Sequence, residues 1–251
     1  MLRLVIICAD YPELPSGIGD YTHKLVSELR AGNAEVHVIT TSHDQIRADD
    51  HILQVDWGAA SLGRIARYCS EHAIQFINIQ YPAPLYGKYS LVPQLIAISL
   101  RLRGYDVITT LHEFSNNNIL RRLSMSVFFL ASAAVVMTTR YELDAVLRQF
   151  SLFGAKRIKN KTCIIPIGSN LDPCLSPDVE ARAESKIISY FGVFYPSKGA
   201  ERSIEIMQEI DQLYLGKFTF RFIGGTHPYY RDYFENFKRQ AEQSLERTEF
   251  V

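Results

Sequence analysis

One glycine-containing loop has residue types that suit the binding of an anion. Ser16-Gly17-Ile18-Gly19-Asp20 lies between an apolar strand and a helical segment. Glycines there let the backbone approach a ligand, and the amino end of a helix favours a negative group. The loop is not G-x-G-x-x-G, since Thr22 stands at the third glycine, and no acidic residue follows ~20 residues later at a strand end. A dinucleotide site is therefore disfavoured, and an anion-binding loop and a plain tight turn remain open.

A histidine and a glutamine stand at the ends of predicted strands. His112 follows the apolar run 106–111, and Gln80 follows the run 76–79. Ligands of open parallel sheets bind at the carboxyl ends of the strands, so both residues are candidates to contact a ligand. The alternative for His112 is a strand-end histidine whose hydrogen bonds are satisfied within the fold.

A polar loop contains residue types that can ligate a metal, namely His43, Asp44, Asp49, Asp50 and His51. Their irregular spacing favours a solvated loop over a metal centre. We predict no metal site in this chain.

Two further segments could have a function, but a structural interpretation is favoured for each. The stretch 81–89 carries Tyr81, Tyr86 and Tyr89, whose rings could stack on a sugar, although a proline-rich connection is favoured. A basic group could contact anionic lipid, although a solvated loop before a strand is favoured. It consists of Lys156, Arg157, Lys159 and Lys161.

These candidates are positioned by alternating short β-branched runs and longer amphipathic segments. Such alternation predicts β-α-β units and a doubly wound parallel sheet that is covered on both faces. Strands are predicted over 2–9, 35–41, 76–79, 106–111, 135–138 and 162–167. Helices are predicted over 21–29, 61–72, 91–102 and 119–131, with another that begins at Thr139-Arg-Tyr-Glu142 in capping-box spacing.

A change in composition separates two series of such units. Residues 1–170 form a predicted Rossmann-like domain, 171–186 a linker, and 187–251 the start of a second Rossmann-like domain. In the second series, strands are predicted over 187–191 and 218–223 and helices over 199–212 and 229–245. The sequence from Glu249 resembles the start of another strand, so we expect this second domain to be incomplete.

Length and charge exclude several classes of protein. The chain has 251 residues and 27 Lys and Arg against 27 Asp and Glu, so its formal net charge is zero and nucleic acid is a disfavoured partner. Cys8 and Cys163 lie in apolar strand-like runs and are expected to be buried, which favours a reduced compartment. The uncharged stretch 123–139 is expected to be a helix end running into a buried strand, not a membrane span. We predict a cytoplasmic protein.

Several segments, in the order in which they occur, resemble the family 4 glycosyltransferases of the GT-B fold. The glycine loop and the strand 34–39 match the start of that family's amino-terminal domain. The later matching segments are Val107-Ile-Thr-Thr-Leu-His112-Glu-Phe, Ala133-Ala-Val-Val-Met-Thr-Thr139, Cys163-Ile-Ile-Pro-Ile-Gly-Ser-Asn170, Tyr190-Phe-Gly-Val-Phe-Tyr-Pro-Ser-Lys198-Gly199 and Phe222-Ile-Gly-Gly225.

This resemblance implies a retaining, metal-independent transfer of a sugar from a UDP- or GDP-linked donor, without a cofactor. The acceptor would be a glycan or a lipid-linked glycan in polysaccharide or glycoconjugate assembly, with peripheral contact to the inner face of a membrane. His112 would contact the donor sugar as the catalytic residue, and Lys198 would stabilise the leaving diphosphate. The residues that the resemblance assigns to donor binding are Gly17, Ile18, Gly19, Gly192, Lys198 and Gly224.

The sequence departs from the family pattern in its second domain. An arginine often follows the glycine that Gly192 matches, and here Val193 follows. The family's glutamate-x7-glutamate motif would lie beyond residue 251; Glu201 and Glu209 have that spacing but are expected to be solvated helix residues. We therefore expect little or no transfer by this chain alone. The alternatives are a non-catalytic half that needs a partner chain and, less favoured, a different nucleotide-binding Rossmann enzyme such as a dehydrogenase.

Overall fold

The computed structural model of the protein divides into two compact units, Met1–Asp172 and Pro173–Val251. The structure describes residues 1–11, 16–43, 49–81, 86–87, 90–151, 154–169, 175–176, 180, 185–226 and 230–251.

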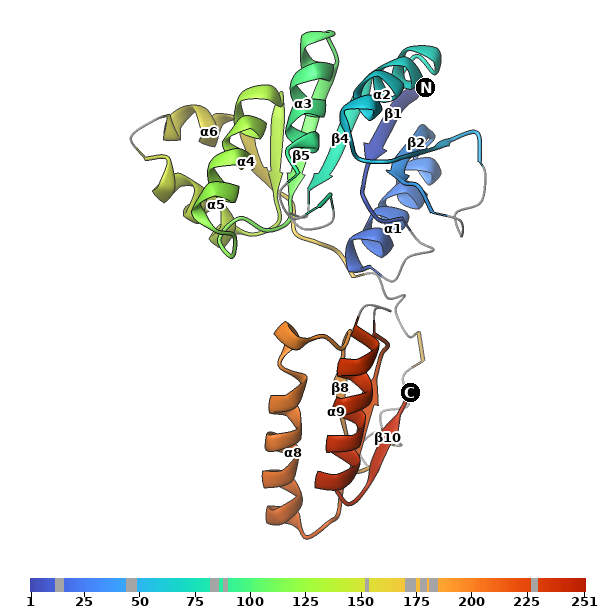
Figure 1. Ribbon diagram of the computed structural model, residues 1–251, viewed down its shortest axis with the longest axis vertical. Helices are drawn as coiled ribbons and strands as arrows, with labels where there is room; N and C mark the ends of the chain where they lie inside the picture. The colour runs from blue at the N-terminus through green and yellow to red at the C-terminus, as the bar shows by residue number, and fades with distance from the viewer. Residues whose placement is uncertain are drawn as a thin grey trace. The chain divides into compact units, whose positions relative to one another are not determined.

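The first unit is built on a seven-stranded sheet in the order β3-β2-β1-β4-β5-β6-β7, in which all neighbouring strands are parallel. Strands β1, β4 and β5 run side by side through its middle (Figure 1). The strands are β1 (Leu2–Ile7), β2 (Ala34–Thr41), β3 (Ile52–Val55), β4 (Phe76–Tyr81), β5 (Asp106–Leu111), β6 (Ala134–Met137) and β7 (Thr162–Ile164).

Helices lie on both faces of this sheet, as the nearly continuous apolar strands predict. The helices are α1 (Gly17–Ala31), α2 (Ala59–Glu71), α3 (Val92–Leu102), α4 (Ile119–Ala131), α5 (Arg140–Gln149) and α6 (Ala155–Lys161). In β1, Leu4 and Ile6 pack with Val26 of α1, whereas Val5 and Ile7 belong to the larger core that α2 to α6 share. Successive side chains of a strand point to opposite faces, so α1 lies on one face and α2 to α6 on the other.

The sequence predicted most of these elements but not all. Strand β3 was not predicted, and the predicted loop around the basic group is helix α6, which buries Ile158. The Lys161 side chain donates to the backbone oxygens of Ser132 (2.9 Å) and Phe129 (3.4 Å), so it satisfies carbonyls at the end of α4. The prediction for Cys163 was wrong: β7 is an edge strand, and this cysteine is exposed, whereas Cys8 is buried.

The second unit is a three-stranded parallel sheet in the order β10-β9-β8, made of β8 (Ile187–Phe191), β9 (Thr219–Ile223) and β10 (Thr248–Phe250). Helices α8 (Ala200–Tyr214) and α9 (Arg231–Ser244) lie beside each other, and a short turn of 3-10 helix, Pro196–Lys198, precedes α8 (Figure 1). Its core is rich in aromatic residues and includes Phe194, Phe220, Phe222 and Phe237.

Within the described part of the chain, no helix is long and apolar enough to cross a membrane. The uncharged stretch 123–139 is divided between α4 and β6, as predicted.

Candidate functional site

A groove of about 380 Å³ lies between α1 and the sheet of the first unit. Its walls are mostly apolar and come from α1 and from the face of β1, β4, β5 and β6 that α1 covers only in part. Its lining residues are Leu2, Leu4, Ile6, Tyr21, Leu25, Leu29, Phe76, Ile77, Asn78, Gln80, Ile108, Thr110, Val136 and Ile165. Concave apolar surfaces with a few converging polar groups are the usual form of small-molecule sites.

A row of hydrogen-bonded polar side chains begins in this lining and ends at His112. The amide of Asn78 donates to the Thr110 hydroxyl oxygen at 3.2 Å, and the amide of Gln80 donates to the Asn78 carbonyl oxygen at 2.6 Å. The Gln80 carbonyl oxygen lies 2.7 Å from Nε2 of His112. The row therefore leads from the floor of the groove to the carboxyl end of β5.

The protonation of His112 follows from this row. Burial lowers the pKa of His112 to about 4, so the imidazole is neutral near neutral pH. Because the Gln80 amide is donated to Asn78, the Gln80 oxygen accepts, and Nε2 of His112 must carry the proton. Nδ1 is then an acceptor, and this buried atom has no hydrogen-bond partner among the described residues. His112 is suited to accept a hydrogen bond from a ligand.

A buried glutamate fixes the loop that follows His112. The carboxylate of Glu142 accepts hydrogen bonds from the backbone nitrogens of Phe114 (2.9 Å) and Ser115 (2.8 Å) and from the Ser115 hydroxyl (2.7 Å). The Thr139 hydroxyl caps the start of α5 by accepting from the backbone nitrogen of Glu142, as the capping-box spacing predicted. The Glu142 side chain reaches the loop after β5, where it positions the end of that strand.

The predicted glycine loop is the amino terminus of α1. The Ser16 hydroxyl accepts from the backbone nitrogen of Gly19, Gly17 is exposed, and Gly19 is buried against the backbone of Asp10. One helical turn further, the ring of Tyr21 meets the ring of His112 edge-on, with centroids 5.5 Å apart. The structure thus brings the first turns of α1, which include Ile18, to the same end of the sheet as His112.

The other groups near this end have structural roles. The Cys8 thiol donates to the backbone oxygen of Asp10 at 2.9 Å, and burial raises its pKa to about 12, which removes it as a nucleophile. Tyr81 and Tyr86 are buried, and the Tyr86 hydroxyl lies within hydrogen-bond distance of the backbone oxygens of Ile7 and Gln80. Tyr89 lies outside the described residues, so the possibility that it stacks on a sugar is untested.

The second unit brings its predicted residues to the carboxyl end of its own sheet. Gly192 follows β8 and Gly224 follows β9, and a Cβ on Gly224 would collide with the backbone oxygen of Gly192. Lys198 is exposed just before α8, with its ammonium 5.5 Å from the centre of the Tyr195 ring. Gly199, between Lys198 and the helix, has the left-handed φ of 71° that glycine tolerates. A cation and a helix amino end therefore lie together at this edge.

Several residues of the candidate site were not predicted from sequence. Asn78, Thr110 and Tyr21 had no motif to mark them, although Asn78 and Gln80 are unusual polar residues on one face of a central strand. Glu201 and Glu209 both lie on α8, where Glu209 is exposed. Of the predicted polar cluster, Asp44 lies outside the described residues, and His51 contacts Asp49.

Known structures share this fold over most or all of the chain. HepE of Anabaena in complex with UDP-glucose aligns with a TM-score of 0.72 and 13% identity, covering 100% of this chain and 69% of its own. The catalytic domain of starch synthase IV of Arabidopsis thaliana, bound to ADP and acarbose, aligns with a TM-score of 0.62 and 12% identity, covering 100% and 74%. UDP-N-acetylglucosamine 2-epimerase of Rickettsia bellii aligns with a TM-score of 0.56 and 14% identity, covering 100% and 68%.

No protein-family profile and no curated protein sequence matches this chain. The structural likeness therefore establishes the fold, which is α/β and of the GT-B type: a doubly wound parallel sheet followed by a second Rossmann-like unit.

Proposed function

We propose that this protein is a nucleotide-sugar-dependent glycosyltransferase similar to family 4, and that His112 contacts the sugar of the donor. The observation that carries the proposal is the buried neutral imidazole at the carboxyl end of β5, within a GT-B-type fold. Structures of HepE with UDP-glucose and with UDP and glucose support a nucleotide sugar as the ligand class.

The chemistry of His112 suits a group that positions a sugar. With a pKa of about 4, the imidazole is a weak base near neutral pH, and its Nδ1 can accept a hydrogen bond from a sugar hydroxyl. Such a contact orients the donor and contributes to catalysis through alignment of the reacting carbon. The proposed transfer is retaining and needs no metal.

Lys198 and the glycines of the second unit suit the diphosphate of the donor. Gly224 lets its own backbone lie against that of Gly192, which shapes the turn where the diphosphate would bind, and the exposed ammonium of Lys198 supplies a positive charge. A fixed cation stabilises the negative charge that develops on the departing nucleoside diphosphate. In the first unit, Gly17 and Ile18 at the start of α1 would face phosphate or acceptor, while Gly19 would support them by packing against the backbone of Asp10.

The acceptor in this proposal is a glycan or a lipid-linked glycan. Contact with anionic lipid rests on the exposed residues Lys156, Arg157 and Lys159 of α6, since Lys161 is engaged with backbone oxygens. The alternative function, a half-enzyme that acts with a partner chain, predicts co-purification with a second protein that supplies the glutamate motif.

Calorimetric titration of the chain with UDP and with UDP-glucose tests the proposal. Replacing Lys198 by alanine should weaken the binding of both ligands by about 10- to 100-fold, which corresponds to the loss of one charge-assisted hydrogen bond. Replacing His112 by glutamine keeps a donor toward Gln80 but removes the Nδ1 acceptor, so it should weaken UDP-glucose by about 10-fold and leave UDP unchanged.

The matched control is His112→Asn, whose shorter side chain keeps a polar atom near the position of Nδ1 and loses the contact to Gln80. Equal weakening of UDP and UDP-glucose by His112→Gln would contradict the role given to His112. Binding of NAD or NADP in place of UDP would favour the dehydrogenase alternative.

A further inference from the structure

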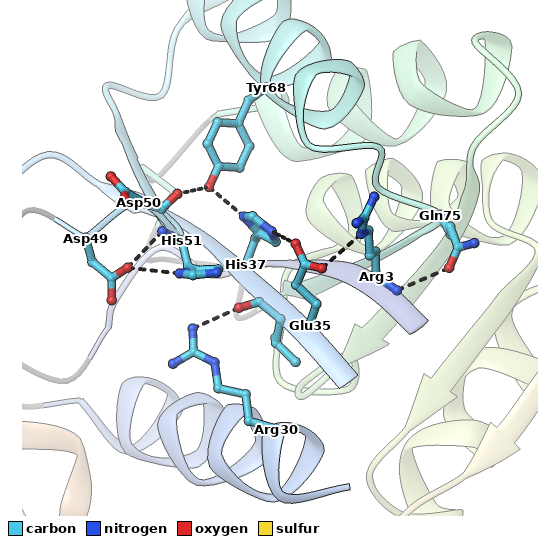
Figure 2. Close-up of polar contacts among 10 residues, drawn as sticks. Arg3, Arg30, Glu35, His37, Asp49, Asp50, His51, Tyr68 and Gln75 are labelled. Atoms are coloured by element: carbon cyan, nitrogen blue, oxygen red, sulfur yellow. Dashed lines mark hydrogen bonds and ion pairs between the residues drawn. The ribbon is translucent and has the colours of Figure 1, made fainter. Parts of the chain in front are cut away.

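A second polar cluster lies at the opposite, amino end of the sheet, on the face that α2 covers. Glu35 and His37 project from the same face of β2, and His51 directly precedes β3. One possible ligand atom from each of the three residues lies within 4.8 Å of the other two. Figure 2 shows the His37 ring between Tyr68 and Glu35, with the His51 ring beside it.

The first two ligand atoms already have the spacing of a metal site. Nε2 of His37 lies 3.2 Å from Oε1 of Glu35. In a tetrahedral zinc site with bonds of about 2.1 Å, neighbouring ligand atoms stand about 3.4 Å apart. The third residue can adjust, because the side chain of His51 is 47% exposed.

Tyr68 provides the outer hydrogen bond that a metal-bound His37 requires. Nδ1 of His37 lies 2.8 Å from the Tyr68 hydroxyl oxygen, and that hydroxyl donates to the backbone oxygen of Asp50 at 3.1 Å. In this arrangement Nδ1 carries the ring proton, and Nε2 presents a lone pair to the Glu35 carboxylate. A divalent cation between Nε2 and Oε1 would bind both lone pairs and leave the hydrogen bonds of Tyr68 in place; in the metal-free chain, a second ring proton on Nε2 would donate to Glu35 instead.

Asp49 provides the same support for His51. Its carboxylate oxygen lies 3.3 Å from Nδ1 of His51 and also accepts from the backbone nitrogen of His51 at 2.8 Å. A carboxylate on one ring nitrogen fixes the tautomer in which the other nitrogen can bind a metal, and such outer partners are a general feature of histidine–metal sites.

We propose that Glu35, His37 and His51 bind a divalent transition-metal ion of the zinc class, with water as the fourth ligand. Two imidazoles and one carboxylate suit Zn²⁺, while Mg²⁺ and Ca²⁺ take oxygen ligands. The remaining carboxylate oxygen of Glu35 is held by Arg3 at 2.9 Å, which orients the ligand. The ion would join β2 to the segment before β3, at the end of the sheet away from His112, and would act on stability.

The test uses the full chain without a histidine tag, titrated with Zn²⁺ by calorimetry and with Co²⁺ by visible absorption. The expected result is one saturable site per chain and the intense d–d bands of four-coordinate Co²⁺. His51→Ala and Glu35→Gln should each weaken the binding of Zn²⁺ by more than about 100-fold, and Tyr68→Phe should weaken it by about 10- to 100-fold. His23→Ala, which removes an exposed histidine of α1 outside the cluster, should leave binding unchanged.

His72 lies beside the proposed ligands but is not one of them, so it provides a control. Its ring packs 4.7 Å from the His37 ring, measured between centroids, but it is outside the group of three. His72→Ala should change the affinity by less than about 10-fold, since it removes packing and no ligand. Unchanged Zn²⁺ affinity in His51→Ala, loss of binding in His72→Ala, or the absence of a saturable site in the unsubstituted chain would overturn the proposal.

Discussion

Two buried histidines of one sheet, His112 after β5 and His37 in β2, show how partners decide what an imidazole can do. Burial lowers the pKa of both, so both are neutral near neutral pH. His112 donates through Nε2 to the neutral amide of Gln80, and its Nδ1 lacks a partner among the described residues. In His37, Nδ1 lies 2.8 Å from the Tyr68 hydroxyl oxygen, and Nε2 lies 3.2 Å from the Glu35 carboxylate.

The difference separates two kinds of ligand. A lone pair with no charged neighbour suits a ligand hydroxyl, as a sugar supplies. A lone pair beside a carboxylate suits a cation, because the negative charge favours it. Two buried imidazoles thus have different chemistry at the two ends of the strands.

The largest expected effect concerns the support of the carboxyl-end site. Glu142→Ala removes the carboxylate that holds the backbone nitrogens of Phe114 and Ser115, and it should lower the free energy of unfolding by about 4 kcal/mol. Asp144→Ala, on the same helix, removes only an exposed ion pair with Arg140 and should cost less than about 0.5 kcal/mol. Urea denaturation of both variants measures this contrast. Equal losses of stability would contradict the claim that Glu142 holds the loop after β5 in place.

The second largest expected effect is the pH dependence of stability that His112 causes. Its folded pKa of about 4 is below the unfolded value of 6.5, so the unfolded chain binds more protons between these values. The contribution of His112 is fully present above pH 6.5 and is lost as the pH falls toward 4. The loss amounts to about 3 kcal/mol.

Urea denaturation of the unsubstituted chain and of His112→Gln, at pH 7 and at pH 4.5, isolates the contribution of His112 to the free energy of unfolding. The variant should show a smaller loss of stability at the lower pH. Parallel pH curves for the two proteins would contradict a lowered pKa of His112 and, with it, the neutral imidazole on which the comparison rests.

The hydroxyl that orients His37 has a smaller expected effect. Tyr68→Phe removes the group between Nδ1 of His37 and the backbone oxygen of Asp50, so the metal-free chain should lose about 1 kcal/mol. Tyr141→Phe is the matched control, because Tyr141 is 65% exposed on α5. Thermal unfolding in the presence of a chelator measures both, and a stable Tyr68→Phe protein would mean that Nδ1 needs no partner.

His51→Ala should have the smallest effect on the metal-free chain, below about 0.5 kcal/mol, since its side chain is 47% exposed. The same variant should abolish any stabilisation by Zn²⁺. A large loss of stability without metal would indicate that His51 is a packing residue of the amino-end cluster.

The sequence predicts more of the fold than of the candidate site. The apolar strands, the glycine that ends α1 and the capping residue Thr139 are local signals, and they placed most elements within a few residues. Helix α6 was missed because its sequence is mostly charged and only Ile158 is buried. The predicted exclusion of metal ligands considered only the loop around His51, since Glu35 and His37 become its neighbours through the pairing of β2 with β3.

The row from Thr110 to His112 illustrates the same limit. Its members come from β4 and β5, and their contacts depend on strand register, which pairs Asn78 with Ile108 and Gln80 with Thr110. Sequence spacing could mark His112 as a strand-end residue, but not the tautomer that Gln80 imposes on it. Glu142 was expected to close a capping box, whereas tertiary contact turns its carboxylate to Ser115.

The most direct test of a donor site at His112 is the ¹⁵N NMR signal of its Nδ1, followed while UDP and then UDP-glucose are added to the labelled chain. If Nδ1 accepts a hydrogen bond from the donor sugar, its resonance shifts upfield with UDP-glucose and stays in place with UDP. A resonance that does not move at saturating UDP-glucose, or that moves equally with UDP, would contradict the role assigned to this histidine.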